Sequence, residues 1–168
     1  MPITNLDEKF THELGDIYDA EHRFLEAQRL MVQQASDDKL KGMIQEHITQ
    51  TQGQIEVLNQ VYQALGQQPQ RITCDAAVGL VREGQKGMQE AQSRSIRDCM
   101  IAGAIAKVEH YEMASYRGLV AGAQMMGNQQ VMSLLQQNLQ QEEQAAQQIE
   151  RTAPQLLEKA MQQQERGR

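Results

Sequence analysis

The chain has 168 residues and a mass of 19.0 kDa, a size that suits one domain and leaves little room for a second. Only 4% of the residues are aromatic and helix formers dominate, which argues against a β-sandwich or a barrel. The net charge is −6 and the basic residues are scattered, which argues against nucleic-acid binding. No apolar run reaches the roughly 18 residues of a membrane span, and the N-terminus lacks a signal-peptide core. Cys74 and Cys99 form neither a CxxC pair nor a disulfide framework. We therefore expect a soluble, cytoplasmic helical protein.

Capping and stop residues divide the chain into long helices. Ser36 can cap the second helix, and Gly66 is placed as its C-terminal stop. Ser95, with Asp98 three residues later, is a candidate cap for the third long helix, which we expect to end at Gly127. The predicted helices cover about residues 4–34, 36–65, 75–92, 95–127 and 128–152, with a short tail helix at about 154–165.

The connections between these helices predict the topology. Helices joined by tight turns must be antiparallel, whereas the segment at about 67–95 is long enough to travel the length of a bundle. We predict an all-α fold with a single domain over residues 1–168. Two hairpins and one long crossover, which carries the short helix, would form a ferritin-like four-helix bundle over about 4–150. We expect the last long helix to end near Pro154, before the tail helix.

Polar residues interrupt the apolar stripe of each long helix near its centre. The stripes follow alternating steps of four and three residues, which should direct them to the bundle core. The interrupting residues are Glu21, His47, Thr51, Gln54, Glu109, Glu112 and Glu142. Glu21, Thr51, Glu112 and Glu142 each lie 15 residues from a predicted turn. This separation is roughly 22 Å along a helix, so we expect them to meet at one level of the core.

Four carboxylates inside an apolar core are costly unless they are protonated, paired with cations or hydrated. The stripes carry no lysine or arginine at this level, and carboxylate oxygens suit hard divalent ions. Four glutamates would balance two such ions. Glu109 and Glu112 project in the same direction and could share or bridge a metal pair, although an isolated Glu-x-x-Glu is more often a surface pair.

Two histidines are adjacent to these acids in the sequence, but their side chains should point away from the predicted core. His22 follows Glu21 and points about 100° away from it, so the motif that it forms with Asp19 is interpreted as a decoy. His110 stands in the same relation to Glu109.

Three polar residues could contact the acids without binding the metal themselves. His47 fits a hydrogen-bonded core residue, or a residue that supports the ligands, better than a ligand. Thr51 could belong to the same supporting shell. Tyr116, one turn beyond Glu112, could donate a hydrogen bond to a ligating carboxylate, or its hydroxyl could be satisfied by the backbone.

Several segments resemble the YciE/YciF family of ferritin-like bacterial proteins, a domain of unknown function linked to stress responses. They are DIYDAEHRFLEA, HITQTQGQIEVL, KVEHYEMASY and LLQQNLQQEEQAAQQI. The resemblance spans about residues 5–149 and implies a ferritin-like bundle, a homodimer and a dinuclear metal site. The acids of the ferritin-like pattern fall on Glu21, Glu109, Glu112 and Glu142, and the helix-2 acid of rubrerythrins and bacterioferritins would fall near Gln54.

The chain departs from the usual di-iron pattern at the second acid and at both histidines. Gln54 is neutral, and Gln50 stands where close family members often carry glutamate. Val57 and Ala145 stand where a histidine would follow each acid, so both Glu-x-x-His motifs are missing. We therefore expect weaker metal affinity than in a di-iron oxidase, with Mn or Mg as alternatives to Fe.

Two functions follow from these residues. The first is a metal-binding stress-response protein that holds two Fe or Mn ions, with O₂ or peroxide as the reactant if the site is redox-active. Its expected ligands are Glu21, Gln54, Glu109, Glu112 and Glu142. The alternative is a metal-free structural or interaction protein, a dimeric bundle that has lost redox chemistry. A storage cage has no support in the sequence, and Leu25 and Leu30 are candidate dimer contacts.

Overall fold

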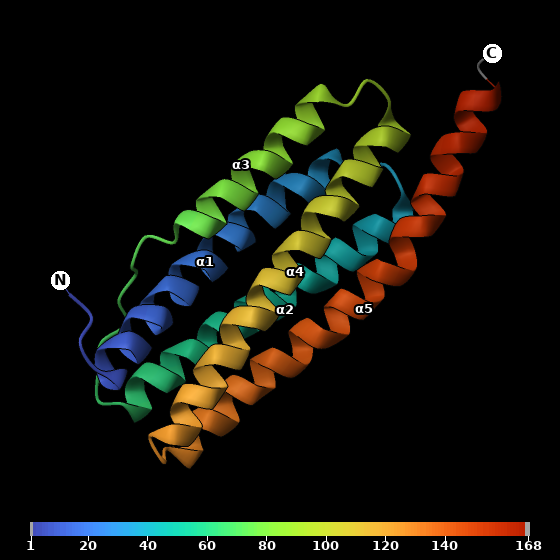
Figure 1. Ribbon diagram of the computed structural model, residues 1–168. Helices are drawn as coiled ribbons and strands as arrows, with labels where there is room; N and C mark the ends of the chain where they lie inside the picture. The colour runs from blue at the N-terminus through green and yellow to red at the C-terminus, as the bar shows by residue number, and fades with distance from the viewer. Residues whose placement is uncertain (1, 167–168) are drawn as a thin grey trace.

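The computed structural model describes residues 2–166, and all regular secondary structure in that range is helical, as predicted (Figure 1). The helices are α1 (Leu6–Gln34), α2 (Asp38–Ala64), α3 (Asp75–Glu90), α4 (Arg94–Met125) and α5 (Gln129–Arg166). None of them is both long enough and apolar enough to cross a membrane.

The four long helices lie side by side around a common core. α1 packs against α2 and α4, and α5 packs against the same two helices. The hairpins α1–α2 and α4–α5 are each antiparallel (Figure 1). The crossover between them runs along the outside, where α3 packs against both α1 and α4.

The two helix ends predicted from glycine, after α2 and after α4, are confirmed. Gly66 and Gly127 have φ values of 66° and 68°, the left-handed conformation that glycine adopts at low cost after a helix. The predicted cap at Ser36 is wrong, because Asp37 caps α2 by accepting a hydrogen bond from the Leu40 N–H at 2.9 Å.

Asp98 explains why the serine caps were misplaced. Its carboxylate accepts hydrogen bonds from Ser36 N at 2.7 Å, Ser36 Oγ at 2.5 Å and Asp37 N at 3.0 Å. It therefore holds the α1–α2 turn against α4 and takes no part in a cap with Ser95. Ser93 caps α4 instead, by accepting a hydrogen bond from Ile96 N at 3.2 Å.

The predicted break near Pro154 is also wrong, because α5 runs without interruption through this residue to Arg166. Proline lacks the N–H that would bond to the preceding turn, at a cost of about 3 kcal/mol. Leu156 is only 3% exposed, and burying a leucine contributes about 1.5–3 kcal/mol, which offsets most of that cost. Tertiary packing thus stabilises the helix across Pro154.

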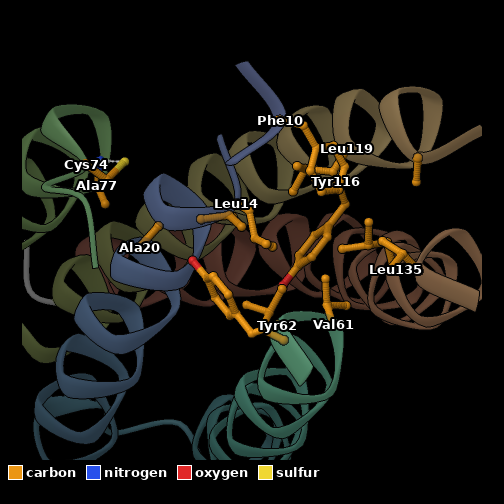
Figure 2. Close-up of a cluster of buried hydrophobic side chains, with 14 of the residues drawn as sticks. Phe10, Leu14, Ala20, Val61, Tyr62, Cys74, Ala77, Tyr116, Leu119 and Leu135 are labelled. Atoms are coloured by element: carbon orange, nitrogen blue, oxygen red, sulfur yellow. Dashed lines mark hydrogen bonds between the residues drawn. The ribbon is translucent and has the colours of Figure 1, made fainter. Parts of the chain in front are cut away.

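The core has an apolar cluster on each side of a polar middle layer. Figure 2 shows one cluster, in which Leu14, Leu119 and Leu135 pack near Tyr62 and Tyr116. The other cluster includes Met31, Leu40, Ile44, Ile101 and Ile149. The polar residues between the clusters are those that interrupt the apolar stripes.

Candidate metal centre

Four glutamates from three helices are buried in the middle of the bundle. Glu21 lies on α1, Glu109 and Glu112 lie on α4, and Glu142 lies on α5. None of the four is more than 1% exposed. Each occupies the core-facing stripe of a regular helix, so the common rise per residue brings them to one level.

The acids and one histidine form two groups that could each hold a metal ion. One group contains Glu21, Glu112 and Glu142, and the other contains His47, Glu109 and Glu142. Within each group, one ligand atom from every residue lies within 4.8 Å of the others. Glu142 belongs to both groups and therefore stands between two potential ion positions.

His47 lies inside the cluster and not behind it. Its Nδ1 atom is 3.1 Å from Glu109 Oε1, and its Nε2 atom is 3.9 Å from Glu142 Oε2. Neither contact is a hydrogen bond. Burial lowers the pKa of His47 from 6.5 to about 4, so the imidazole is neutral at physiological pH and both of its nitrogens face carboxylates.

A hydrogen-bonded chain supports the Glu21 side of the cluster. Tyr116 donates its hydroxyl proton to Glu21 Oε1. Asn138 Nδ2 in turn donates to Tyr116 Oη at 3.0 Å and to the Gln54 backbone carbonyl at 3.2 Å. Of the two alternatives for Tyr116, the structure therefore selects the hydrogen bond to a carboxylate.

Gln54 and Thr51 approach the cluster in different ways. Gln54 Nε2 donates to Glu142 Oε1, while Gln54 Oε1 has no hydrogen-bond partner. Thr51 Oγ1 accepts a hydrogen bond from Gln28 Nε2 at 3.0 Å. Gln54 is thus in direct contact with the acids, and Thr51 is tied to a buried glutamine of α1.

Asn138 and Gln28 also belong to the site, although neither was predicted from the sequence. Asn138 follows Leu135 by three residues, whereas a step of four selects Leu139, which is only partly buried. Both steps are compatible with a helical stripe, so the choice depends on the rotation of α5. Gln28 lies seven residues after Glu21, on the same face of α1, and this spacing could have identified it.

Burial raises the pKa of all four carboxyl groups. For Glu109 and Glu112 the negative charge of the neighbouring glutamates raises it further, and for Glu21 the charge of Glu142 acts in the same direction. Burial raises the pKa of Glu142, while its hydrogen bonds, including the one from Gln54, lower it and so reduce the shift. Without a cation, this layer of the core therefore favours protonated carboxyl groups.

The donor set fits a divalent transition-metal ion. Among the described residues, six buried carboxylate oxygens of these glutamates and His47 Nε2 have no hydrogen-bond partner. No lysine or arginine is buried in that part of the chain to balance them. Carboxylates together with one imidazole suit Fe(II) or Mn(II), whereas Mg(II) prefers oxygen ligands alone.

Asp19, which forms the decoy motif with His22, belongs to neither acid group and has a structural role. Asp19 accepts hydrogen bonds from Arg23 Nε at 2.5 Å, Arg71 Nε at 2.9 Å and Cys74 N at 3.0 Å. It thereby fixes the crossover to α1. His22 packs edge-on against the Tyr18 ring, with centroids 4.9 Å apart, outside both acid groups.

His110 is likewise a surface residue. Its Nε2 atom lies 3.3 Å from Glu150 Oε1, and both side chains are more than half exposed. It contributes to neither of the two buried groups.

An all-helical protein with a buried layer of carboxylates and one imidazole is the class that this geometry defines. Residues 5–162 match the family described as "Domain of unknown function (DUF892)", and the chain belongs to this family. Protein YciF of Escherichia coli (strain K12) is 32% identical over 143 residues, which cover 84% of this chain and 86% of that protein. The predicted resemblance to YciE/YciF proteins is thus confirmed.

Solved structures agree with this assignment. The crystal structure of the E. coli stress protein YciF matches with a TM-score of 0.89 and 29% identity, covering 94% of this chain and 99% of that chain. YcfI of Rhodopseudomonas palustris, to which a structural role is attributed, matches with a TM-score of 0.87 and 34% identity, covering 88% and 94%. A protein of Xanthomonas campestris pv. campestris shares the fold, with a TM-score of 0.76, 20% identity and coverage of 96% and 99%.

Proposed function

We propose that this chain is a ferritin-like, metal-binding stress-response protein whose core holds up to two divalent ions, Fe or Mn. The supporting observation is the set of buried carboxylate oxygens and the His47 nitrogen that lack hydrogen-bond partners and have no buried lysine or arginine beside them in residues 2–166. A divalent cation would satisfy these atoms and offset the cost of burying their charge. Two antiparallel hairpins joined by a long crossover support the ferritin-like assignment.

Each of the two residue groups would hold one ion. Glu21 and Glu112 would bind the first, His47 and Glu109 would bind the second, and Glu142 would contribute to both. A redox-active ion bound there would supply an electron for the reduction of O₂ or peroxide. The site would be mainly oxygen-lined, with His47 providing the imidazole that the missing Glu-x-x-His motifs do not.

The supporting side chains would orient the ligands. Gln54, predicted as a ligand, would instead hold Glu142 in place through its amide N–H, with its unpartnered Oε1 facing away from that bond. Tyr116 would hold a proton toward Glu21, and Asn138 would fix the Tyr116 hydroxyl. Because the carboxyl groups must lose their protons to bind an ion, metal affinity would rise with pH.

A metal-free structural role is the second candidate. It is supported by the structural role attributed to YcfI and by the raised pKa values of the glutamates, which allow a neutral core. On this view the protonated carboxyl groups would be a remnant of a former metal site.

We also propose a cytoplasmic homodimer. Free Cys74 and Cys99 support a reducing compartment. Leu30 is 44% exposed on α1 and remains a candidate contact, whereas Leu25 is 8% exposed and is buried within its own chain.

Elemental analysis decides between the two functions. Protein purified without chelators, then incubated anaerobically with Fe(II) or Mn(II), should contain about two ions per chain, one for each residue group. Glu142→Gln should lose both, since Glu142 is shared. Glu143→Gln is the matched control, because Glu143 is the adjacent residue and is paired with Arg117 at the surface. Absence of metal from the wild-type protein would favour the structural role.

A further inference from the structure

The seam between α2 and α5, which pack side by side (Figure 1), contains a small hollow that we call the α2–α5 hollow. Gln50 of α2 and Ala145 and Gln148 of α5 line its outer part. Gln148 is exposed, and Gln50 and Ala145 are half-buried, so the hollow opens to the surface at these residues. His47 and Glu109 lie at its inner end and are 5% and 0% exposed. The hollow therefore connects the surface with one of the two proposed ion positions.

Glutamine side chains follow this seam from the surface to the acids. Gln50 and Gln148 stand at the mouth, and Gln54 and Gln141 lie one turn further along their helices, toward the acids. The Oε1 atoms of Gln54 and Gln141 are buried and have no hydrogen-bond partner within residues 2–166. Carbonyl oxygens suit Mn(II), and among the described residues that line the hollow there is no lysine or arginine to repel a cation. The seam thus offers oxygen ligands without positive charge.

Ala145 leaves space in the seam. It stands three residues after Glu142, where the usual di-iron pattern has a histidine, and a ring at this position would extend into the hollow. The hollow has a volume of about 10 Å³, the space for one water-sized molecule. A fully hydrated divalent ion is larger than that, so it must exchange its water ligands for protein oxygens in order to pass.

We propose that the α2–α5 hollow is the route by which divalent cations enter the metal centre. In this route Gln50 and Gln148 replace water ligands of the ion at the mouth, and the small side chain of Ala145 keeps the path open. The inference rests on the proposed function, because it names the path to the proposed ligands. His47 and Glu109 are the first of these ligands along the path, and Glu142, which belongs to both groups, lies between the two ion positions.

A second hollow reaches the same pair from beneath α3 and is less suited to a cation. Its lining is mainly apolar and includes Phe24, Leu80 and Val81. Apolar side chains offer no oxygen to an ion that is losing water, so each lost water would go unreplaced there. The glutamine-lined seam therefore presents the lower barrier.

Filling the α2–α5 hollow should slow metal uptake without changing metal affinity. Ala145→Leu adds bulk to the hollow and leaves every proposed ligand in place. A side chain that only obstructs the path raises the barrier for entry and for exit equally, so both rate constants fall by the same factor and Kd is unchanged. A residue that shapes the ligands themselves would change Kd instead.

Rapid mixing with Mn(II) measures the effect without any redox reaction. Metal-free wild-type, Ala145→Leu and Gln144→Leu proteins are mixed with Mn(II), quenched with excess chelator at a series of times and desalted, and their manganese content is measured. Ala145→Leu should take up Mn(II) severalfold more slowly than the wild type. Gln144→Leu is the matched control, because Gln144 is the adjacent residue and is exposed, and its uptake should match the wild type. Release from the loaded proteins into chelator should slow by the same factor in Ala145→Leu alone.

Refolding in the presence of Mn(II) bypasses the path, because the ion can bind before α2 and α5 close around it. Ala145→Leu refolded from urea with Mn(II) should therefore contain as much manganese as the wild type. This result would distinguish an obstructed route from a damaged site.

The outcomes separate this inference from the proposed function. Equal uptake rates for the wild type and Ala145→Leu would overturn the entry route and leave the metal site standing. A folded Ala145→Leu protein, as judged by circular dichroism, that stays poor in manganese after refolding would also overturn it, since Ala145 would then shape the site and not the path. A wild-type protein that takes up no Mn(II) by mixing or by refolding would overturn the proposed function, and the entry route with it.

Discussion

Replacing Glu112 with glutamine should stabilise the metal-free protein at neutral pH. Glu112 is 1% exposed, and neither of its carboxylate oxygens has a hydrogen-bond partner. Burial raises the pKa of its carboxyl group well above 4.5, and the charges of Glu142, Glu21 and Glu109 raise it further. Glutamine has nearly the same shape as the protonated acid and carries no proton that can be lost.

The sign and size of the effect follow from the raised pKa. The folded protein keeps a proton on Glu112 that the unfolded chain releases above its ordinary pKa of 4.5. The contribution of this bound proton to the free energy of unfolding is fully present below pH 4.5, and it is lost as the pH rises toward the folded-state pKa. While the folded protein holds this proton and the unfolded chain does not, the loss is roughly 1 kcal/mol per pH unit. Glu112→Gln should remove this part of the pH dependence.

Urea denaturation of chelator-treated protein at pH 5, 6 and 7 measures the effect. The free energy of unfolding should fall less steeply with pH in Glu112→Gln than in the wild type. Glu143→Gln is the control, and its pH dependence should match the wild type, since an exposed ion pair contributes about 0–1 kcal/mol. Identical pH slopes for wild type and Glu112→Gln would refute the conclusion that this carboxyl group is protonated in the metal-free core.

Three further substitutions test other contacts. Tyr116→Phe removes the hydrogen bond to Glu21, so it should lower the free energy of unfolding of the metal-free protein by about 1 kcal/mol. It should also weaken Mn(II) binding about tenfold, as measured by calorimetry. An unchanged affinity would contradict a supporting role for Tyr116. Asp98→Ala removes three hydrogen bonds from the α1–α2 turn and should lower the free energy of unfolding by about 2–3 kcal/mol in urea, whereas a change near zero would show that the turn does not need them. Gly15→Ala should destabilise the protein by about 1 kcal/mol, although alanine has the better helix propensity, because the alanine Cβ would lie 2.7 Å from Ile72 Cγ1. A gain in thermal stability would show that the Ile72 side chain moves aside freely.

Helix ends were predictable where the signal is local. Gly66 and Gly127 end helices because a left-handed residue is needed there, and glycine adopts that conformation at low cost. The start of α2 was not predictable in the same way, since Ser36 and Asp37 are both good caps. Asp98, 62 residues after Ser36, decides between them through hydrogen bonds that only the folded structure provides.

The glutamates of the site were predictable because the rise per residue in a straight helix is constant, so the sequence separation from a turn gives the position along the bundle axis. Equal distances from the turns placed Glu21, Glu112 and Glu142 at one level, and the structure brings them together. Height alone does not give the direction of a side chain. The contact of His47 with Glu109 depends on the rotation and tilt of α2 relative to α4, which no residue of either helix specifies by itself.

Anomalous diffraction from crystals soaked in Mn(II) tests the metal assignment most directly. The proposal predicts two manganese peaks in the core, one bound by Glu21, Glu112 and Glu142 and the other by His47, Glu109 and Glu142. Crystals with no anomalous peak in this layer, at Mn(II) concentrations that saturate surface sites, would contradict it. The four glutamates would then be protonated structural residues.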